Sequence, residues 1–474
     1  MVEGRLSDQL RRDNIRLIDC RQDADTMRLD LDIGSEDVVR AFSKLLVSSH
    51  EPLTVVLGDA EFCPNRIVPV VALADIYRRN GGEVTFVCRQ GTAAEMALTG
   101  FASSRMRPEK TIARPLGRVW CFCNGDELGM IVNACELEIN RTVRLAKGVR
   151  LCYSWCLNEI LDNVLTHSAP DGRAIGYVMV QYLPKGNLLK TCVFDAGIGL
   201  MASFANSKYS PTDAADAIRL AVMRNVTSGN GQGNGLYGLK RLVGQSPDGR
   251  LHIRSADAEY LYAPAKNIDN ARTSWMLADL QGTTTVDFQI CCDGELSFDG
   301  VFPDGMPLVD LWVENRESNN GSVCVSVTEI VDNCGSRSAG REMRTLVENL
   351  VETDGCKVVI DFGEIENCSS GFVDELLGKL IEKYGFVSFS QKISFKNIHG
   401  IVALLINHSI SQRIVASYSG DEFPSNASIR IDSTEDSGNN AINSAWADSH
   451  PQSEAQGGEE RNVESEGAFR EARQ

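Results

Sequence analysis

The chain has 474 residues, of which 43% are hydrophobic and 23% are charged, and its formal net charge is -17. This is the composition of a globular protein of roughly three domains. So negative a balance disfavours nucleic acid as the main partner, because binding to a phosphate backbone requires Lys and Arg.

Features of membrane and secreted proteins are missing from the sequence. The N-terminus lacks the apolar core of a signal peptide, and no apolar run approaches the ~18 residues that a membrane helix needs. The 15 cysteines form no C-x-x-C pair and lie mostly in apolar runs, a pattern typical of reduced thiols. We therefore expect a cytoplasmic protein that does not span a membrane.

Composition and pattern divide the chain into five segments. They are an N-terminal extension (1–24), an α/β unit with its linker (25–115), a second block (116–293), a third block (294–431) and a polar tail (432–474). The α/β unit alternates an expected strand over 26–33, a helix over 35–47, a strand over 53–58, a further helix and a strand over 81–88. The tail has too few large apolar residues to form a core, so we expect it to be disordered.

The first and third blocks share an internal repeat of element order. Residues 53–87 and 356–390 both read as an apolar strand, an acidic turn, a short loop, an amphipathic helix, a glycine and a strand. The repeat indicates either a duplication or two unrelated βαβ units with the same order.

In the second block, a helix expected over 154–168 carries two different faces. Its apolar face is formed by Leu157, Ile160, Leu161, Val164 and Leu165. Glu159, Asn163 and His167 follow one another at intervals of four, which places them in a polar stripe on the other side. The stripe is either a solvated face or part of a metal-phosphate site, with an amide oxygen for Mg²⁺ and a carboxylate as base.

A second polar signal follows an apolar strand that ends at Asp195. Gly197 and Gly199 follow this carboxylate two and four residues later. The pattern is either an ordinary Asp-Gly turn or a place where a flat ring lies on the backbone and the carboxylate accepts a hydrogen bond from its exocyclic amine. A helix should then start with Ser210 as its N-cap and Pro211 at its first position.

A glycine-rich segment precedes the next helix, which is expected over 236–243. It carries Gly229, Gly231, Gly233, Gly235 and Gly238. Such a cluster is either a flexible linker or a phosphate cradle, in which bare amides and a helix start face an anion. Strands are expected over 249–262 and 274–290, and the second contains Gly282 and Thr283.

The order E-x-x-x-N, D-x-G-x-G, glycine-rich segment and G-T resembles the GHKL ATPases, over about residues 135–290. This superfamily includes gyrase B, Hsp90-type chaperones, sensor histidine kinases, MutL and the anti-sigma serine kinases. The resemblance implies binding of ATP and Mg²⁺, with Asn163 on the metal, Glu159 as base and Asp195 on the adenine. It further implies Gly197 and Gly199 beside the base, Gly231, Gly233, Gly235 and Gly238 around the phosphates, and Thr283 near Asp195. Lys240 and Arg241 follow the glycines as further candidates for phosphate contact.

Within this superfamily, the stretch NEILDNVLTHS looks most like the anti-sigma-type serine kinases. A sensor histidine kinase would need a histidine on a long upstream helix, and the only earlier histidine is His50. A gyrase or MutL relative would need a long transducer domain, which the sequence does not contain.

The third block carries a second resemblance. Residues 357–385, KVVIDFGEIENCSSGFVDELLGKLIEKYG, resemble STAS-like folds, and more narrowly the STAS-like domain attached to bacterial ATP-binding proteins. Residues 336–350 would form the preceding helix. Ser369 and Ser370 match the position of a phosphorylatable serine, or they simply cap a helix. The equivalent loop of the first block, 61–70, has no serine.

The expected fold class is therefore α/β: a central GHKL-type sandwich, with a mixed sheet and helices on one face, between two STAS-like domains. The expected function is signalling by an ATPase or protein-serine kinase that hydrolyses ATP or transfers its γ-phosphate to serine in a STAS-like partner or domain. Alternatives are a non-catalytic ATP-gated switch or scaffold, and an ATPase subunit of a nucleic-acid or defence complex. Expected partners are a regulatory protein of the STAS-like or sigma type and a second copy of the chain.

Overall fold

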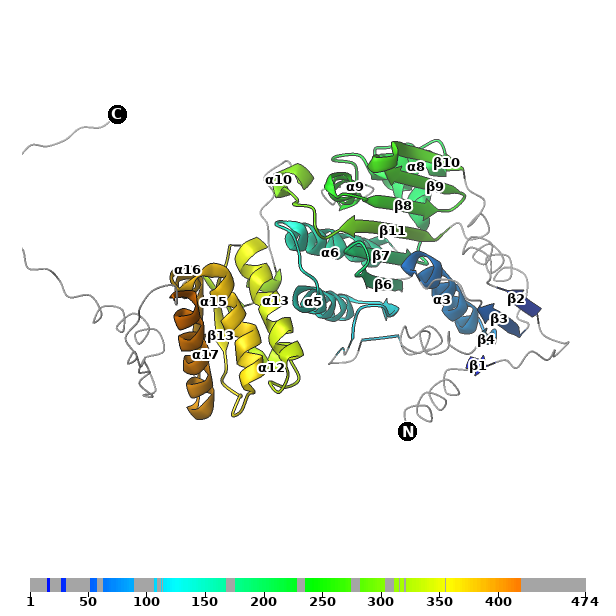
Figure 1. Ribbon diagram of the computed structural model, residues 1–474. Helices are drawn as coiled ribbons and strands as arrows, with labels where there is room; N and C mark the ends of the chain where they lie inside the picture. The colour runs from blue at the N-terminus through cyan, green and yellow to red at the C-terminus, as the bar shows by residue number, and fades with distance from the viewer. Residues whose placement is uncertain are drawn as a thin grey trace, which may run out of the picture.

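The computed structural model describes three domains. The described residues are 15–17, 27–30, 52–57, 63–88, 106–108, 112, 114–167, 175–227, 235–273, 282–302, 311–314, 316–318, 321–353 and 355–418. Below, residues 15–88 form the N-terminal domain, 114–302 the central domain and 311–418 the C-terminal domain (Figure 1). The helix expected over 35–47 and the tail expected to be disordered lie outside the described residues.

The N-terminal domain has a parallel sheet with strand order β1-β4-β3-β2. Its elements are β1 (Ile15–Leu17), β2 (Met27–Asp30), β3 (Leu53–Leu57), α3 (Pro64–Arg79) and β4 (Val84–Cys88). Helix α3 makes the crossover between the neighbouring strands β3 and β4, as the βαβ pattern predicts. Strand β1 pairs with β4, so residues 15–17 belong to this domain and not to an extension.

The central domain is built on a seven-stranded sheet with order β10-β9-β8-β11-β7-β6-β5. Its strands are β5 (Trp120–Phe122), β6 (Gly176–Leu183), β7 (Leu188–Asp195), β8 (Arg250–Ser255), β9 (Ala258–Ala263), β10 (Ile268–Thr273) and β11 (Thr284–Cys291). Each described strand runs antiparallel to its neighbours.

Helices cover one face of this sheet and enclose the main core. They are α5 (Gly125–Thr142), α6 (Val149–His167), α7 (Gly199–Ser203), α8 (Ala214–Ala221), α9 (Gly235–Gln245) and α10 (Phe298–Val301). The core includes Leu296 and Phe302, so the central domain extends past the expected boundary at residue 293. Asp213 caps α8 by accepting from the amide of Asp216, so the expected cap at Ser210 is wrong; the helix starts one turn later.

The opposite face of the central sheet is covered by α3 from the N-terminal domain, which contacts β6, β7 and β11 (Figure 1). The central sheet thus lies between two helical layers that come from different domains.

The C-terminal domain has a parallel sheet with order β12-β13-β14. Its strands are β12 (Ser322–Ser326), β13 (Lys357–Asp361) and β14 (Ile393–Lys396). Its helices are α11 (Leu311–Glu314), α12 (Val327–Ile330), α13 (Arg337–Thr353), α14 (Ser370–Val373), the π-helical turn η3 (Asp374–Gly378), α15 (Lys379–Tyr384), α16 (Phe386–Lys392) and α17 (Gly400–Tyr418). Helix α13 packs against α5 of the central domain (Figure 1).

The last strand predicted for the internal repeat is wrong. Residues 386–392 form α16, and the strand comes afterwards as β14. Phe386 and Phe389 lie three residues apart on the packed side of α16, whereas Val387 is 57% exposed. Phe386, Val387 and Phe389 are of residue types that favour strands. Among the described helices, none has the length and apolar character needed to cross a membrane.

Candidate functional site

Glu159 and Asn163 lie one turn apart on α6, and both are half-buried. The helix is fixed by its other side, where Leu157, Ile160, Leu161 and Val164 are buried in the core as predicted. Burial and the neighbouring carboxylate of Asp162 raise the pKa of Glu159. Glu159 is therefore a stronger base than an ordinary glutamate. The side chain of His167 lies outside the described residues.

Gly235 begins α9 directly against these two side chains. A Cβ atom on Gly235 would lie 3.1 Å from Asn163 Nδ2 and 3.3 Å from Glu159 Oε2. The end of the glycine-rich segment therefore lies beside the polar stripe of α6. Gly231 and Gly233 lie outside the described residues.

Asp195 ends β7 and is held in place by hydrogen bonds. Its Oδ1 accepts from the amide of Gly197 at 2.8 Å, and its carboxylate also accepts from the hydroxyl of Thr284. Desolvation raises the pKa of Asp195 to about 7 although both hydrogen bonds oppose this shift. Gly199 follows with a φ of +73°, in the left-handed region that favours glycine.

The G-T segment lies against the loop after Asp195. A Cβ atom on Gly282 would lie 2.3 Å from the carbonyl oxygen of Gly197, so a side chain there is excluded. Thr283 is buried, and its carbonyl accepts from Ser255 Oγ at 3.1 Å. The direct partner of Asp195 is the next residue, Thr284, which the sequence analysis missed. Its signal was the run of three threonines that starts β11.

Gly176 joins the two halves of the site. It lies directly across from Asp195 in the β6–β7 pairing. A Cβ atom on Gly176 would lie 2.8 Å from Val164 Cγ1, and Val164 follows Asn163 on α6. The carboxylate of Asp195 and the polar stripe of α6 therefore lie at the same end of the sheet, although they are far apart in sequence.

Three candidates near the glycine-rich segment have other contacts in the structure. A Cβ atom on Gly238 would lie 2.4 Å from Phe302 and 3.0 Å from Trp155, so this glycine permits close helix packing. Lys240 pairs with Asp269 at 2.9 Å, and Arg241 donates to the carbonyl of Gly300. Lys240 thus pairs with β10 and Arg241 with α10.

The candidate cation ligands beside Gly235 are the side chains of Glu159 and Asn163. Among the described residues, no group of three or more His, Cys, Asp or Glu could hold a metal. Asn163 and Glu159 supply oxygen atoms, and Mg²⁺ typically combines few protein ligands with phosphate oxygens and water. Gly235 packs so closely against both residues that a side chain at this position would have to displace them.

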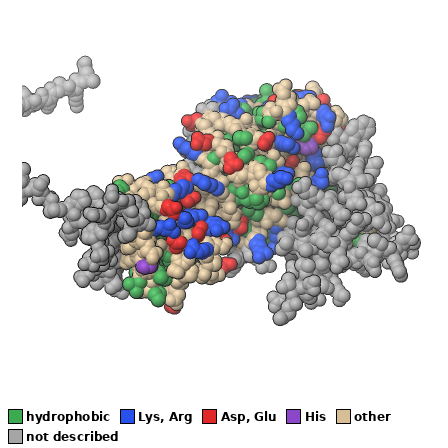
Figure 2. Space-filling model, viewed as in Figure 1, with side chains coloured by type: hydrophobic (Ala, Val, Ile, Leu, Met, Phe, Trp, Pro, Cys, Tyr) green, Lys and Arg blue, Asp and Glu red, His purple; other side chains and the backbone are tan. Residues whose placement is uncertain are grey.

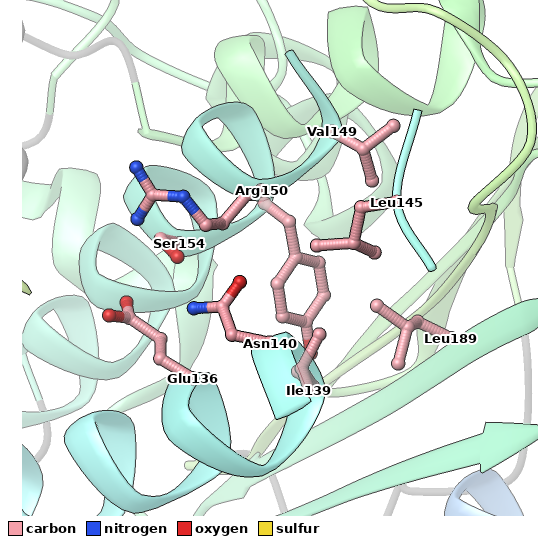
Figure 3. Close-up of a pocket in the computed structure, with 9 residues that line it drawn as sticks. Glu136, Ile139, Asn140, Leu145, Val149, Arg150, Ser154 and Leu189 are labelled. Atoms are coloured by element: carbon pink, nitrogen blue, oxygen red, sulfur yellow. The ribbon is translucent and has the colours of Figure 1, made fainter. Parts of the chain in front are cut away.

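A small cavity lies elsewhere, between α5 and the start of α6 (Figure 3). Its volume is about 10 Å³, and the buried amide of Asn140 points into it near Ser154 and Arg150. Both polar side-chain atoms of Asn140 lack a hydrogen-bond partner in the described structure. A cavity of this size has room for about one water molecule, so it is not a nucleotide site.

In the C-terminal domain, Ser369 is the N-cap of α14. Its Oγ accepts from the amide of Phe372 at 3.0 Å, and its own amide donates to the carbonyl of Cys334. Ser370 is exposed at the first position of the helix. The side chain of Arg337 lies beside Gly371, which follows the two serines. Of the two candidates, Ser370 is thus the accessible hydroxyl.

Residues 339–402 match a family model described as a STAS-like domain of unknown function (DUF4325). The match runs from α13 to the start of α17 and includes both serines, so the C-terminal domain is STAS-like. No curated protein matches the chain. Among solved structures, the chain is similar to the histidine kinase domain of the blue-light-activated histidine kinase of Erythrobacter litoralis EL346. That similarity has 13% identity and a TM-score of 0.18, over 54% of this chain and 95% of the other.

Proposed function

We propose that the protein is an ATP-dependent signalling protein whose central domain binds ATP and Mg²⁺ in the manner of GHKL ATPases. The observation that carries the proposal is the contact of Gly235 with Glu159 and Asn163. It brings the start of α9 to an amide and a carboxylate at the end of the sheet where Asp195 also lies. In this proposal, the three separate sequence motifs form one site.

Each residue has a role in this proposal. Asp195 accepts a hydrogen bond from the exocyclic amine of adenine, and Gly197 and Gly199 let the ring approach the backbone. The amides at Gly235 face the phosphates. Asn163 holds Mg²⁺, which neutralises phosphate charge when bound. Glu159 accepts a proton from water or a serine hydroxyl, a role that its raised pKa favours.

The STAS-like domain is the proposed partner module, either within the chain or in a separate regulatory protein. A nucleic-acid partner has less support. On the face shown in Figure 2, basic and acidic side chains alternate over the STAS-like domain. Pairs such as Arg337–Asp374, Arg344–Glu375 and Lys383–Glu348 neutralise one another there.

The test is incubation of the full chain with γ-labelled ATP and Mg²⁺, reading both label on protein and free phosphate. Label that disappears in Ser370→Ala, which leaves the Ser369 cap intact, would identify a serine kinase. Free phosphate without label would identify an ATPase. ATP binding with neither product would leave an ATP-gated switch, and absence of ATP binding would contradict the proposal.

A further inference from the structure

The back of the nucleotide-binding sheet carries a buried aromatic pair under α3. Tyr177 on β6 and Phe194 on β7 lie directly across from each other, and both are 0% exposed. Their neighbours Val178 and Val193 face the helical core, so alternation along the strands turns Tyr177 and Phe194 to the other side. Their rings meet edge to face, with centroids 6.3 Å apart.

A hydrogen-bonded carboxylate ties this aromatic pair to the N-terminal domain. The hydroxyl of Tyr177 donates to Asp75 Oδ2 at 2.6 Å, and Arg79 Nε donates to the same oxygen at 2.8 Å. Asp75 is 8% exposed and Tyr177 is 0% exposed, so the hydrogen bond between them is shielded from water. Burial and the carboxylate of Asp75 raise the pKa of Tyr177, which keeps the phenol protonated as a donor.

The contact lies directly behind the residue proposed to recognise the base. Phe194 precedes Asp195 in β7, and Gly176, which precedes Tyr177, pairs with Asp195. The end of β7 is therefore held by α3, which packs on one face of the sheet, and by the hydrogen bonds that Asp195 accepts from Gly197 and Thr284.

We infer that Tyr177 and Asp75 are positioning residues for nucleobase recognition, acting through the strand end that carries Asp195. The inference rests on the proposed function, because it states how the N-terminal domain positions the nucleobase end of that same site. Coupling between sites is reciprocal, so ATP should in turn stabilise α3 on the sheet.

The experiment measures the ratio of affinities for ATP and inosine triphosphate with the full chain. Inosine triphosphate carries an oxygen in place of the exocyclic amine, so the ratio reports recognition by Asp195 and is insensitive to general loss of folded protein. Tyr177→Phe should lower the preference for ATP by about 5-fold or more, with little change for inosine triphosphate. Tyr182→Phe is the matched control on the same strand, where the hydroxyl donates to Asn187 Oδ1 at 2.9 Å.

Two further measurements separate positioning from a structural role. Asp75→Asn keeps an acceptor for Tyr177 and should preserve more of the ratio than Asp75→Ala. Hydrogen exchange of the α3 amides should slow when ATP binds the parent protein. If the parent preferred ATP but Tyr177→Phe kept the same ratio, the inference alone would fail. If the parent bound neither nucleotide, the proposed function would fail with it.

Discussion

Asp195 and Thr284 lie directly across from each other on β7 and β11, and the threonine hydroxyl donates to the carboxylate. Because the pKa of Asp195 is about 7, its carboxylate changes charge near neutral pH. This carboxylate is the proposed acceptor for the adenine amine. A protonated carboxyl is a weaker acceptor for an amine. ATP affinity should therefore fall as the pH falls through about 7, by up to about 10-fold between about pH 8 and about pH 6.

Calorimetric titration of ATP at several pH values tests this dependence. Thr284→Val removes a hydrogen bond that lowers the pKa, so it should move the midpoint to higher pH. Asp195→Asn should bind ATP weakly with little pH dependence over this range. A flat profile in the parent would argue against Asp195 as the acceptor.

Glu159→Gln should keep ATP binding and lose turnover, by about 10²- to 10⁴-fold, if this residue is the base. Free-phosphate release and nucleotide affinity are measured on the same preparation. Asp162→Asn is the matched variant, since the Asp162 carboxylate helps to raise the pKa of Glu159. It should shift the acid limb of the rate profile to lower pH. An unchanged rate in Glu159→Gln would show that Glu159 is not the base, whereas ATP binding without turnover in the parent would favour the ATP-gated switch.

Asn349→Ala should loosen the STAS-like domain from the central domain. The Asn349 side chain donates to the carbonyls of Asn140 and Val143, both at 2.9 Å, and accepts from the amide of Leu145 at 3.2 Å. Its loss removes the side-chain partner of these buried backbone groups. Each group left unpaired should lower the free energy of unfolding by at most about 1–3 kcal/mol. Urea unfolding and limited proteolysis measure the effect. Thr345→Ala on the same helix, which removes an exposed bond to the carbonyl of Arg341, is the control and should change little.

Gly238→Ala should destabilise the central domain by about 1–3 kcal/mol, because the new methyl group would overlap Phe302 and Trp155. Gly129→Ala on α5 is the contrast, since a Cβ atom there meets nothing within 4 Å. That change should stabilise the helix by about 0.5–1 kcal/mol. Thermal unfolding of both variants gives the comparison, and equal effects would rule out the packing role of Gly238.

Local pattern was enough to predict the elements that carry the site. The two faces of α6 follow from helical spacing, and the strand that ends at Asp195 follows from its apolar run. The side-chain partner of Asp195 could not be found in this way. Whether Thr283 or Thr284 faces it depends on the β7–β11 register, which is set by pairing between segments about ninety residues apart.

Long-range pairing also explains the other differences. Residues 15–17 look like an extension until β4 is placed beside them. The 386–392 segment contains Phe and Val, which favour strands, but Phe386 and Phe389 pack on one side of a helix against the core of the domain. Asp75 gave no signal in the sequence, because its partner Tyr177 belongs to another domain.

The cover that α3 provides limits how the chain can be shortened. A chain that began at residue 116 would expose Tyr177 and Phe194 to solvent as a continuous aromatic strip, and such strips promote self-association. Removal of the STAS-like domain would instead uncover α5, which contacts that domain through polar groups. Arg141 of α5 donates to the carbonyl of Ile330, and Asn349 of α13 donates to the carbonyl of Asn140 on α5. Deletions from the two ends should therefore differ in solubility, with the N-terminal deletion the more prone to aggregate during expression.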